Sequence, residues 1–391
     1  MQRVAVLFLA LALGACATPS AVPDAPPAGR FFDDRLFAAP SMRVRAEDVF
    51  ALSDEMRRYA AREIAELARV KGRQIALIDA LHDAGALRLE YDTESTRNAA
   101  EAFAARSGNC LSLVIMTAAF AKELGLLVDY QKVFVDDSFA RIGNVYLSIG
   151  HVNLTLGRRT IDTFSVGHRV GNRAHESLST TVDFLPPGDL RSMRSRPIRE
   201  EIVVAMFMNN RAVEALARGR VDDAYWWARE AIVQAPEFVA AYNTLGAIYL
   251  RHGNPGEAER ALAHVLRAEP ENTQAMSNQV AALAALGRTE DAQRLAAHRD
   301  RLQPAPPFHH FNRGLAALQS GDSRAARDEF AREVARDPYY HEFQFWLGIT
   351  YLNTGDYALA RKHLALALET STTQRDRDLY ASKLDRIRAL H

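Results

Sequence analysis

The chain is poor in cysteine, since among its 391 residues only Cys16 and Cys110 carry a thiol. Two cysteines exclude a disulfide framework of the kind that holds small secreted domains together. The length of the chain predicts two or three domains.

Net charge is also absent, because 48 Lys and Arg residues balance 48 Asp and Glu residues. A chain without a basic excess gives no indication of nucleic-acid binding. Membrane-spanning apolar runs are absent as well. The apolar run Val4–Leu13 near the start is too short to span a membrane as a helix, but it has the length of a secretory signal.

The end of that run reads Leu13-Gly14-Ala15-Cys16. Small residues followed directly by cysteine resemble the lipobox of bacterial lipoproteins. The resemblance implies a signal peptide over residues 1–15, lipid on the Cys16 thiol, and a proline-rich tether over residues 16–30. The lack of Asp after Cys16 favours the outer membrane by the same analogy. We therefore expect a periplasmic protein that contacts the membrane through its lipid, and the alternative is an ordinary signal peptide with a chance cysteine.

The next segment, residues 31–90, has a helical pattern. From Ala46 to Leu81 its apolar residues recur at spacings of three and four. Thr96 is the expected N-cap of a following helix over residues 97–105. Nothing in this segment indicates chemistry beyond packing.

Cys110 stands in the sequence Arg106-Ser-Gly-Asn-Cys110-Leu-Ser112, which runs on into apolar residues as far as Gly125. Serine, glycine and asparagine are turn and capping residues, so we expect Cys110 in the first turn of a buried helix. The positive end of the helix dipole favours a reactive thiolate there. The alternative is that Cys110 is simply a small buried hydrophobic residue.

Beyond this helix the apolar pattern alternates, which predicts strands over Leu127–Val135 and Val145–Leu156, the second with a bulge at Gly150. Gly157-Arg158 fits a two-residue hairpin turn into a third strand over Arg159–Phe164.

This hairpin register places Asp162 opposite Asn153 and diagonal to His151, roughly 7–8 Å away on one polar face. A carboxylate there would hold the imidazole in one tautomer and leave its other nitrogen free for a thiol proton. A three-residue loop would instead place Asp162 on the core face.

The order of a cysteine at a helix start, a histidine on a strand and an aspartate on the next strand is that of papain-like thiol enzymes. Residues 91–165 resemble the transglutaminase-like superfamily. The sequence motifs that carry this resemblance are Gly108-Asn109-Cys110, Gly150-His151-Val152 and Ile161-Asp162-Thr163-Phe164. The resemblance implies an α+β papain-like domain over residues 91–185, with Cys110 as nucleophile, His151 as general base and Asp162 as the orienting carboxylate.

Two polar side chains on these strands, Gln131 and Asn153, are candidate oxyanion donors beside the amide of Cys110. His168 and His175 are alternative bases in a loop rich in Gly, Arg and Ser. We expect no cofactor and no metal, because the adjacent pair His309-His310 does not converge on one helical face.

The C-terminal half repeats with a period of 34 residues. Its markers are Pro236, Pro270, Pro304 and Pro338, and Gly219, Gly253, Gly287, Gly321 and Gly355. This period predicts two short helices per unit with the glycine between them. It resembles the tetratricopeptide repeat. The resemblance implies an all-α solenoid of five units over residues 205–374, after a linker over 186–204 and before a capping helix over 375–391, that binds a protein or peptide partner.

Three functions stay open at this point. The first is a transglutaminase-like thiol enzyme that cleaves or transfers an acyl group from an amide through a cysteine acyl-enzyme. The second is a catalytically inactive, lipid-anchored scaffold that uses the repeats for protein–protein interaction. The third is a cysteine peptidase acting on cell-wall peptides.

Overall fold

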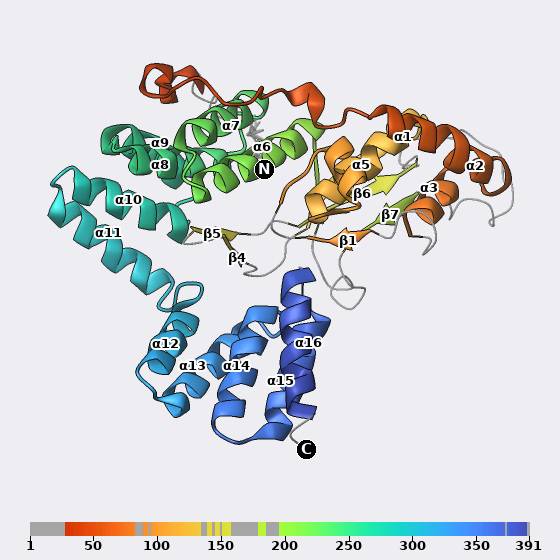
Figure 1. The fold of residues 1–391 in the computed structure, drawn as a ribbon. Coiled ribbons are helices and arrows are strands. Elements are labelled where there is room, and N and C mark those ends of the chain that lie inside the picture. Colours follow the sequence, from red (N-terminus) through yellow and green to blue (C-terminus); the bar gives the residue numbers. More distant parts are fainter. Residues whose placement is uncertain are drawn as a thin grey trace, which may run out of the picture.

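The structure is a computed structural model that describes residues 28–82, 89–92, 95–133, 139–142, 145–148, 151–157, 179–184, 195–371 and 374–388. Three parts follow one another along the chain: an N-terminal segment, a small sheet with a buried helix, and an array of paired helices (Figure 1). Cys16, Asp162, His168 and His175 lie outside the described residues.

The N-terminal segment begins with three 3-10 turns, η1 (Ala28–Phe31), η2 (Asp34–Leu36) and η3 (Ala46–Asp48). We call residues 29–42 the N-terminal arm. The helical pattern then gives α1 (Asp54–Tyr59), a π turn η4 (Ala60–Ile64), α2 (Ala65–Lys71) and α3 (Arg73–His82). Gly72 separates α2 from α3 with a φ of 82°, a conformation that glycine adopts without strain.

The buried helix is α5 (Cys110–Glu123), and α4 (Ala99–Ala105) precedes it. Asn98, and not Thr96 as predicted, is the N-cap of α4, because its side chain forms a capping box with Glu101. Between α4 and α5 the chain forms β2 (Ser107–Gly108), which pairs in parallel with β1 (Glu90–Tyr91).

A four-stranded antiparallel sheet has the order β7-β6-β3-β8. Its strands are β3 (Val128–Val133), β6 (His151–Leu156), β7 (Thr180–Val182) and β8 (Ser195–Ile198). The helix α5 packs against β6 and β3. The predicted neighbour of β6, residues 159–164, lies outside the described residues, and β7 pairs with β6.

Two sequence predictions about the strands need correction. The predicted strand over residues 145–156 is divided between β5 (Val145–Ser148) and β6, and β5 pairs with β4 (Phe139–Ile142) in a separate hairpin. The predicted linker over residues 186–204 contains β8 and the start of the first repeat helix. Its polar composition and Pro197 belong to an exposed edge strand, where proline costs no ladder hydrogen bond.

The array consists of five helix pairs and a final helix. The pairs are α6 (Glu200–Ala217) with α7 (Val221–Gln234), α8 (Val239–His252) with α9 (Pro255–Ala268), α10 (Thr273–Ala285) with α11 (Thr289–Leu302), α12 (His309–Gln319) with α13 (Ser323–Arg336), and α14 (His341–Asn353) with α15 (Tyr357–Glu369). The last helix is α16 (Gln374–Arg388). Each of the five periodic glycines lies between the two helices of its pair with φ between 76° and 89°. The 34-residue register predicted from the sequence is confirmed.

The hydrophobic core is divided along the array. One core runs from Phe31 through α5 and the sheet to Ala282 in α10. Two smaller cores lie farther on, one around Phe311 and Phe330 and one around Leu364 and Tyr380. Among the described helices, none combines the length and apolar character that a membrane crossing requires.

Candidate functional site

Cys110 is the first residue of α5 and is 5% exposed. Asn109 is the N-cap, and its Oδ1 accepts hydrogen bonds from the Ser112 amide (2.9 Å) and hydroxyl (2.8 Å). The backbone at Gly108 lies against Ser112, and only glycine fits there, because a Cβ at residue 108 would lie 2.6 Å from the Cβ of Ser112. The turn therefore fixes the thiol at the helix N-terminus, as predicted from the sequence.

His151 opens β6 and lies between a thiol and a carboxylate. Its Nε2 lies 2.7 Å from Oδ1 of Asp183, and the Cys110 side chain is near enough to raise the pKa of the imidazole. The side chain of His151 is 3% exposed, so these interactions take place away from bulk water.

Asp183 follows β7 directly, and its position follows from the sheet register. Leu154 pairs with Val182, so the residue directly after β7 comes opposite Asn153. Asp183 accepts a hydrogen bond from Nδ2 of Asn153 (2.9 Å) and reaches His151 diagonally. This is the geometry that the hairpin register predicted for Asp162, reached by a residue 21 positions later in the chain.

The sequence contains a signal for this strand that the prediction did not use. The sequence Thr180-Thr181-Val182-Asp183-Phe184 contains β-branched residues, and its apolar residues Val182 and Phe184 alternate with polar ones. The pairing with β6 is not readable from it, because the connection between the two strands is long and a two-residue turn at Gly157-Arg158 offered a local partner instead.

The surroundings of His151 set its charge. Burial lowers the pKa of the imidazole, but the hydrogen bond to Asp183, the hydrogen bond to Cys110 and the charges of both partners raise the pKa to about 9. The imidazolium form is therefore the favoured one at neutral pH.

The two candidate oxyanion donors lie on the same polar face as His151, because Gln131 and Asn153 are paired across β3 and β6. Gln131 donates from Nε2 to the hydroxyl of Thr155 (2.9 Å), whereas Asn153 donates to Asp183. Asn153 thus steadies the carboxylate beside the imidazole. The role of either amide as an oxyanion donor stays a prediction.

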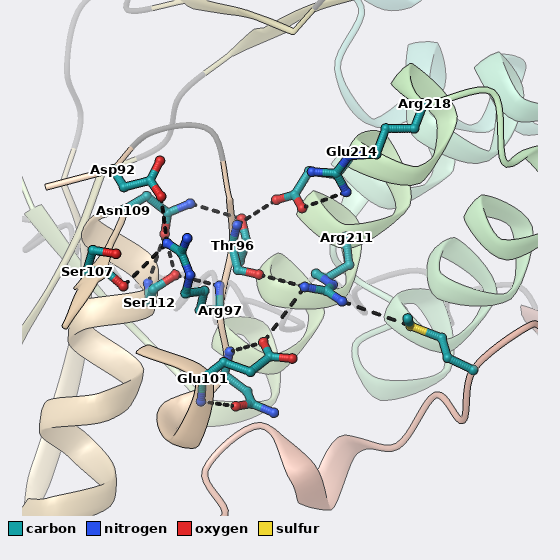
Figure 2. Close-up of polar contacts among 12 residues, drawn as sticks. Asp92, Thr96, Arg97, Glu101, Ser107, Asn109, Ser112, Arg211, Glu214 and Arg218 are labelled. Atoms are coloured by element: carbon teal, nitrogen blue, oxygen red, sulfur yellow. Dashed lines mark hydrogen bonds and ion pairs between the residues drawn. The ribbon is translucent and has the colours of Figure 1, made fainter. Parts of the chain in front are cut away.

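A chain of hydrogen bonds connects the Cys110 turn to the first helix of the array (Figure 2). Nδ2 of Asn109 donates to the hydroxyl of Thr96 (2.9 Å), and the Thr96 amide donates to Oε1 of Glu214 in α6 (2.7 Å). Arg211, also in α6, donates from Nη1 to the Thr96 carbonyl (3.0 Å). Thr96, predicted to cap α4, instead joins the thiol helix to the repeats.

Glu214 is almost fully buried at this junction. Burial raises its pKa, while the hydrogen bonds from Thr96 and the charges of Arg211 and Arg218 act in the opposite direction. The carboxyl group makes its shortest hydrogen bond to the backbone of residue 96, so the array contributes directly to the geometry of the turn before Cys110.

A family model of the tetratricopeptide repeat matches residues 243–304 and 311–375. These residues therefore consist of tetratricopeptide repeats, a motif that mediates protein–protein interaction, and the pair α6–α7 precedes the matched region. Comparison with curated proteins found no match.

Several solved structures are similar to part of this chain. A thermophilic TPR protein of Thermus thermophilus is 23% identical, with 46% of this chain and 98% of that chain covered and a TM-score of 0.29. PilF of Pseudomonas aeruginosa is 18% identical (49% and 94% covered, TM-score 0.27). YrrB, described as a TPR protein with an unusual peptide-binding site, is 21% identical (46% and 92% covered, TM-score 0.25).

Proposed function

We propose that the protein is a thiol enzyme of the transglutaminase-like, papain-like type that acts on amide bonds. The observation that carries this proposal is the position of His151, whose Nε2 lies 2.7 Å from Asp183 and whose pKa is raised by Asp183 and by the neighbouring Cys110 side chain. Cys110 is the nucleophile, His151 is the acid and base, and Asp183 is the positioning carboxylate.

In the proposed reaction the resting pair is a Cys110 thiolate and a His151 imidazolium. The thiolate sulfur attacks the amide carbonyl carbon, and the imidazolium proton passes to the leaving nitrogen as the C–N bond breaks. This gives a thioester and a neutral imidazole. A water or an amine then attacks the thioester carbon, its proton returns to His151, and the thiolate leaves. Water as acceptor gives hydrolysis, and an amine gives acyl transfer.

The remaining parts of the proposal concern location and partners. The lipobox-like sequence at Cys16 supports a lipid-anchored protein on the periplasmic side of a cell membrane, and the missing Asp after it favours the outer membrane. The repeats supply the binding surface for a protein or peptide, and Glu214 of α6 connects the first repeat helix to Thr96 near the Cys110 turn.

The test is the alkylation rate of Cys110 in the folded protein, measured with iodoacetamide between pH 6 and 8. Mass spectrometry of the peptide that contains Cys110 separates its signal from that of Cys16. We expect alkylation at least tenfold faster than for an ordinary exposed thiol at pH 6.5. His151→Ala should slow it at least tenfold, and Asp183→Asn should slow it less, because the imidazole stays but loses its orienting carboxylate.

Asp129→Asn is the matched control, because Asp129 lies in β3 at the exposed end of the same sheet. This variant should react like the natural protein. A Cys110 that reacts no faster than an ordinary thiol, or a His151→Ala variant with an unchanged rate, would contradict the enzyme. The scaffold function would then take its place.

A further inference from the structure

The N-terminal arm lies across the first two helix pairs of the array rather than in solvent; in Figure 1 it is the red segment over α7, α8 and α9. Two aromatic side chains anchor it, since Phe31 and Phe37 are only 5% and 7% exposed. The Phe37 ring stacks on that of Tyr225, with centroids 3.9 Å apart and planes 8° apart. The Phe31 ring meets Tyr242 edge-on at 5.1 Å.

Side chains of the array hold the backbone of the arm between these anchors. The Tyr249 hydroxyl donates to the carbonyl of Phe31 (2.9 Å) and accepts from the amide of Asp33 (3.0 Å). At Ala38 the carbonyl accepts from Nε1 of Trp226 (2.7 Å), and the amide donates to Asp222 (3.0 Å).

Asp223 holds the last contact, with hydrogen bonds from the amide (2.7 Å) and hydroxyl (2.8 Å) of Ser41. The array therefore satisfies the backbone of a segment that is neither in a sheet nor in a long helix.

The array also binds one acidic side chain of the arm, that of Asp34. Oδ1 of Asp34 accepts from the hydroxyl of Tyr225 (2.6 Å) and from Nε of Arg229 (3.0 Å). The anchors and this carboxylate are spaced three residues apart, as Phe31, Asp34 and Phe37. Between them, Arg35 has a side chain that is 90% exposed and that contacts its neighbour Asp33 within the arm.

We propose that the surface of α7, α8 and α9 is a peptide-recognition site, that the arm is its internal ligand, and that its external ligand is a partner segment with the pattern aromatic-x-x-acidic-x-x-aromatic. Side chains that pair with the backbone supply affinity for any segment with the same backbone conformation, while two aromatic contacts and one carboxylate contact supply specificity. This proposal specifies the binding role of the repeats and does not depend on the chemistry of Cys110.

The covalent connection of the arm regulates access to the site. A tethered ligand competes at an effective concentration that reaches about millimolar values for short connections. An external segment of equal intrinsic affinity therefore binds the intact protein far more weakly than a protein whose arm has been detached.

The experiment detaches the arm in the full-length protein. A site for a specific protease is inserted between Met42 and Arg43, which are exposed, and the protein is cleaved and diluted. Binding of a fluorescent peptide of residues 28–42 is then measured by anisotropy. We expect saturable binding to the cleaved protein and at least tenfold weaker binding to the uncleaved protein.

Peptide variants test the recognition pattern. Phe31→Ala and Phe37→Ala should each weaken binding at least tenfold and Asp34→Ala several-fold, whereas Arg35→Ala is the control and should bind unchanged. Equal binding of all four variants would overturn the proposal. So would a cleaved protein that never exchanges its arm, or one that loses helical circular dichroism after cleavage, because the arm would then be an integral part of the fold. Alkylation of Cys110 in the same samples reports on the enzyme separately.

Discussion

His151 is the residue whose ionisation couples the site to pH. Its pKa is raised to about 9 in the folded protein by Asp183 and Cys110, which outweigh the opposing effect of burial, against an ordinary value of 6.5. The folded state therefore holds the proton more tightly than the unfolded chain. The resulting stabilisation is fully present below about pH 6.5 and is lost as the pH rises toward 9.

We predict that the difference in free energy of unfolding between the natural protein and His151→Gln shrinks from pH 6.5 to 9.5. Urea unfolding at several pH values measures it. His298→Gln, a substitution on the exposed side of α11, is the control and should leave the slope of the natural protein unchanged over this interval. A difference that is constant or grows with pH would contradict the imidazolium assignment.

At the same scale, the sequence predicted the positions of Cys110 at a helix start and His151 at a strand start, while Asp162 lies outside the described residues and its role stays a prediction. The short sequence motifs around Cys110 and His151 were sufficient to predict where the helix and the strand begin, because a few neighbouring residues encode each start. The carboxylate was not local. Asp183 comes to His151 because β7 pairs with β6 across a long connection, a pairing that neighbouring residues in the sequence do not encode.

At the scale of the secondary-structure elements, the packing of the repeat helices explains why glycine occurs within some of them. Gly246 lies in α8 against α9, and a Cβ there would lie 2.6 Å from Cγ of Leu262, a side chain with no exposed surface. Gly256 lies in the first turn of α9, and a Cβ at that position would have no atom within 4 Å among its described neighbours. An alanine at residue 246 would test overpacking and helix propensity together, whereas an alanine at residue 256 would test helix propensity alone.

We predict that Gly246→Ala lowers the free energy of unfolding by about 1–3 kcal/mol, because overpacking outweighs the gain in helix propensity. Gly256→Ala should raise it by about 0.5–1 kcal/mol. Denaturant unfolding of both variants measures the two effects. Equal effects at the two positions would contradict the close crossing of α8 and α9.

The junction between α6 and the Cys110 turn gives a second prediction about elements. Glu214→Ala leaves the Thr96 amide without its acceptor in a site where Thr96 is 1% exposed. We expect a loss of about 1–3 kcal/mol of stability and faster hydrogen exchange of the amides of residues 96 and 112.

Glu214→Gln is the matched control for this change. It keeps an acceptor oxygen for Thr96, and burial already raises the pKa of the natural carboxyl group, so removal of the charge costs little. If both variants lose the same stability, the hydrogen bond to Thr96 is not what Glu214 contributes.

The elements themselves were predicted with unequal success. The 34-residue register was readable because proline, glycine and small residues recur at fixed positions. The arm was not, because residues 29–42 have no periodicity of their own and take their structure from the surface that they cover. Strand β8 was predicted to be a linker because exposed edge strands carry polar residues and proline.

At the scale of the whole molecule, the division of the core sets how the protein unfolds. The arm, the sheet and the repeats up to α10 share one core, whereas the later repeats have two small cores of their own. Small cores provide less stabilisation, and a repeat array loses cooperativity where the contact between neighbouring units is weak.

We predict that urea unfolds the part from α12 onward before the rest. The three tryptophans report on the two parts, because Trp226 and Trp227 lie in α7 and Trp346 lies in α14. Fluorescence of a Trp226→Phe/Trp227→Phe variant should show a lower midpoint than that of a Trp346→Phe variant. Coincident midpoints would indicate a single cooperative unit.

The same division of the core bears on how the sequence can change over evolutionary time. Beyond residue 302 the helices bury small cores of their own, whereas the contacts that hold the arm and Thr96 come from helices before residue 269. Duplication or loss of a 34-residue unit toward the C-terminus leaves the Cys110 turn untouched. Before residue 269 the same event would remove a contact of the arm or of Thr96. Related chains should therefore differ in length by multiples of 34 toward the C-terminus, while the first two pairs keep their number.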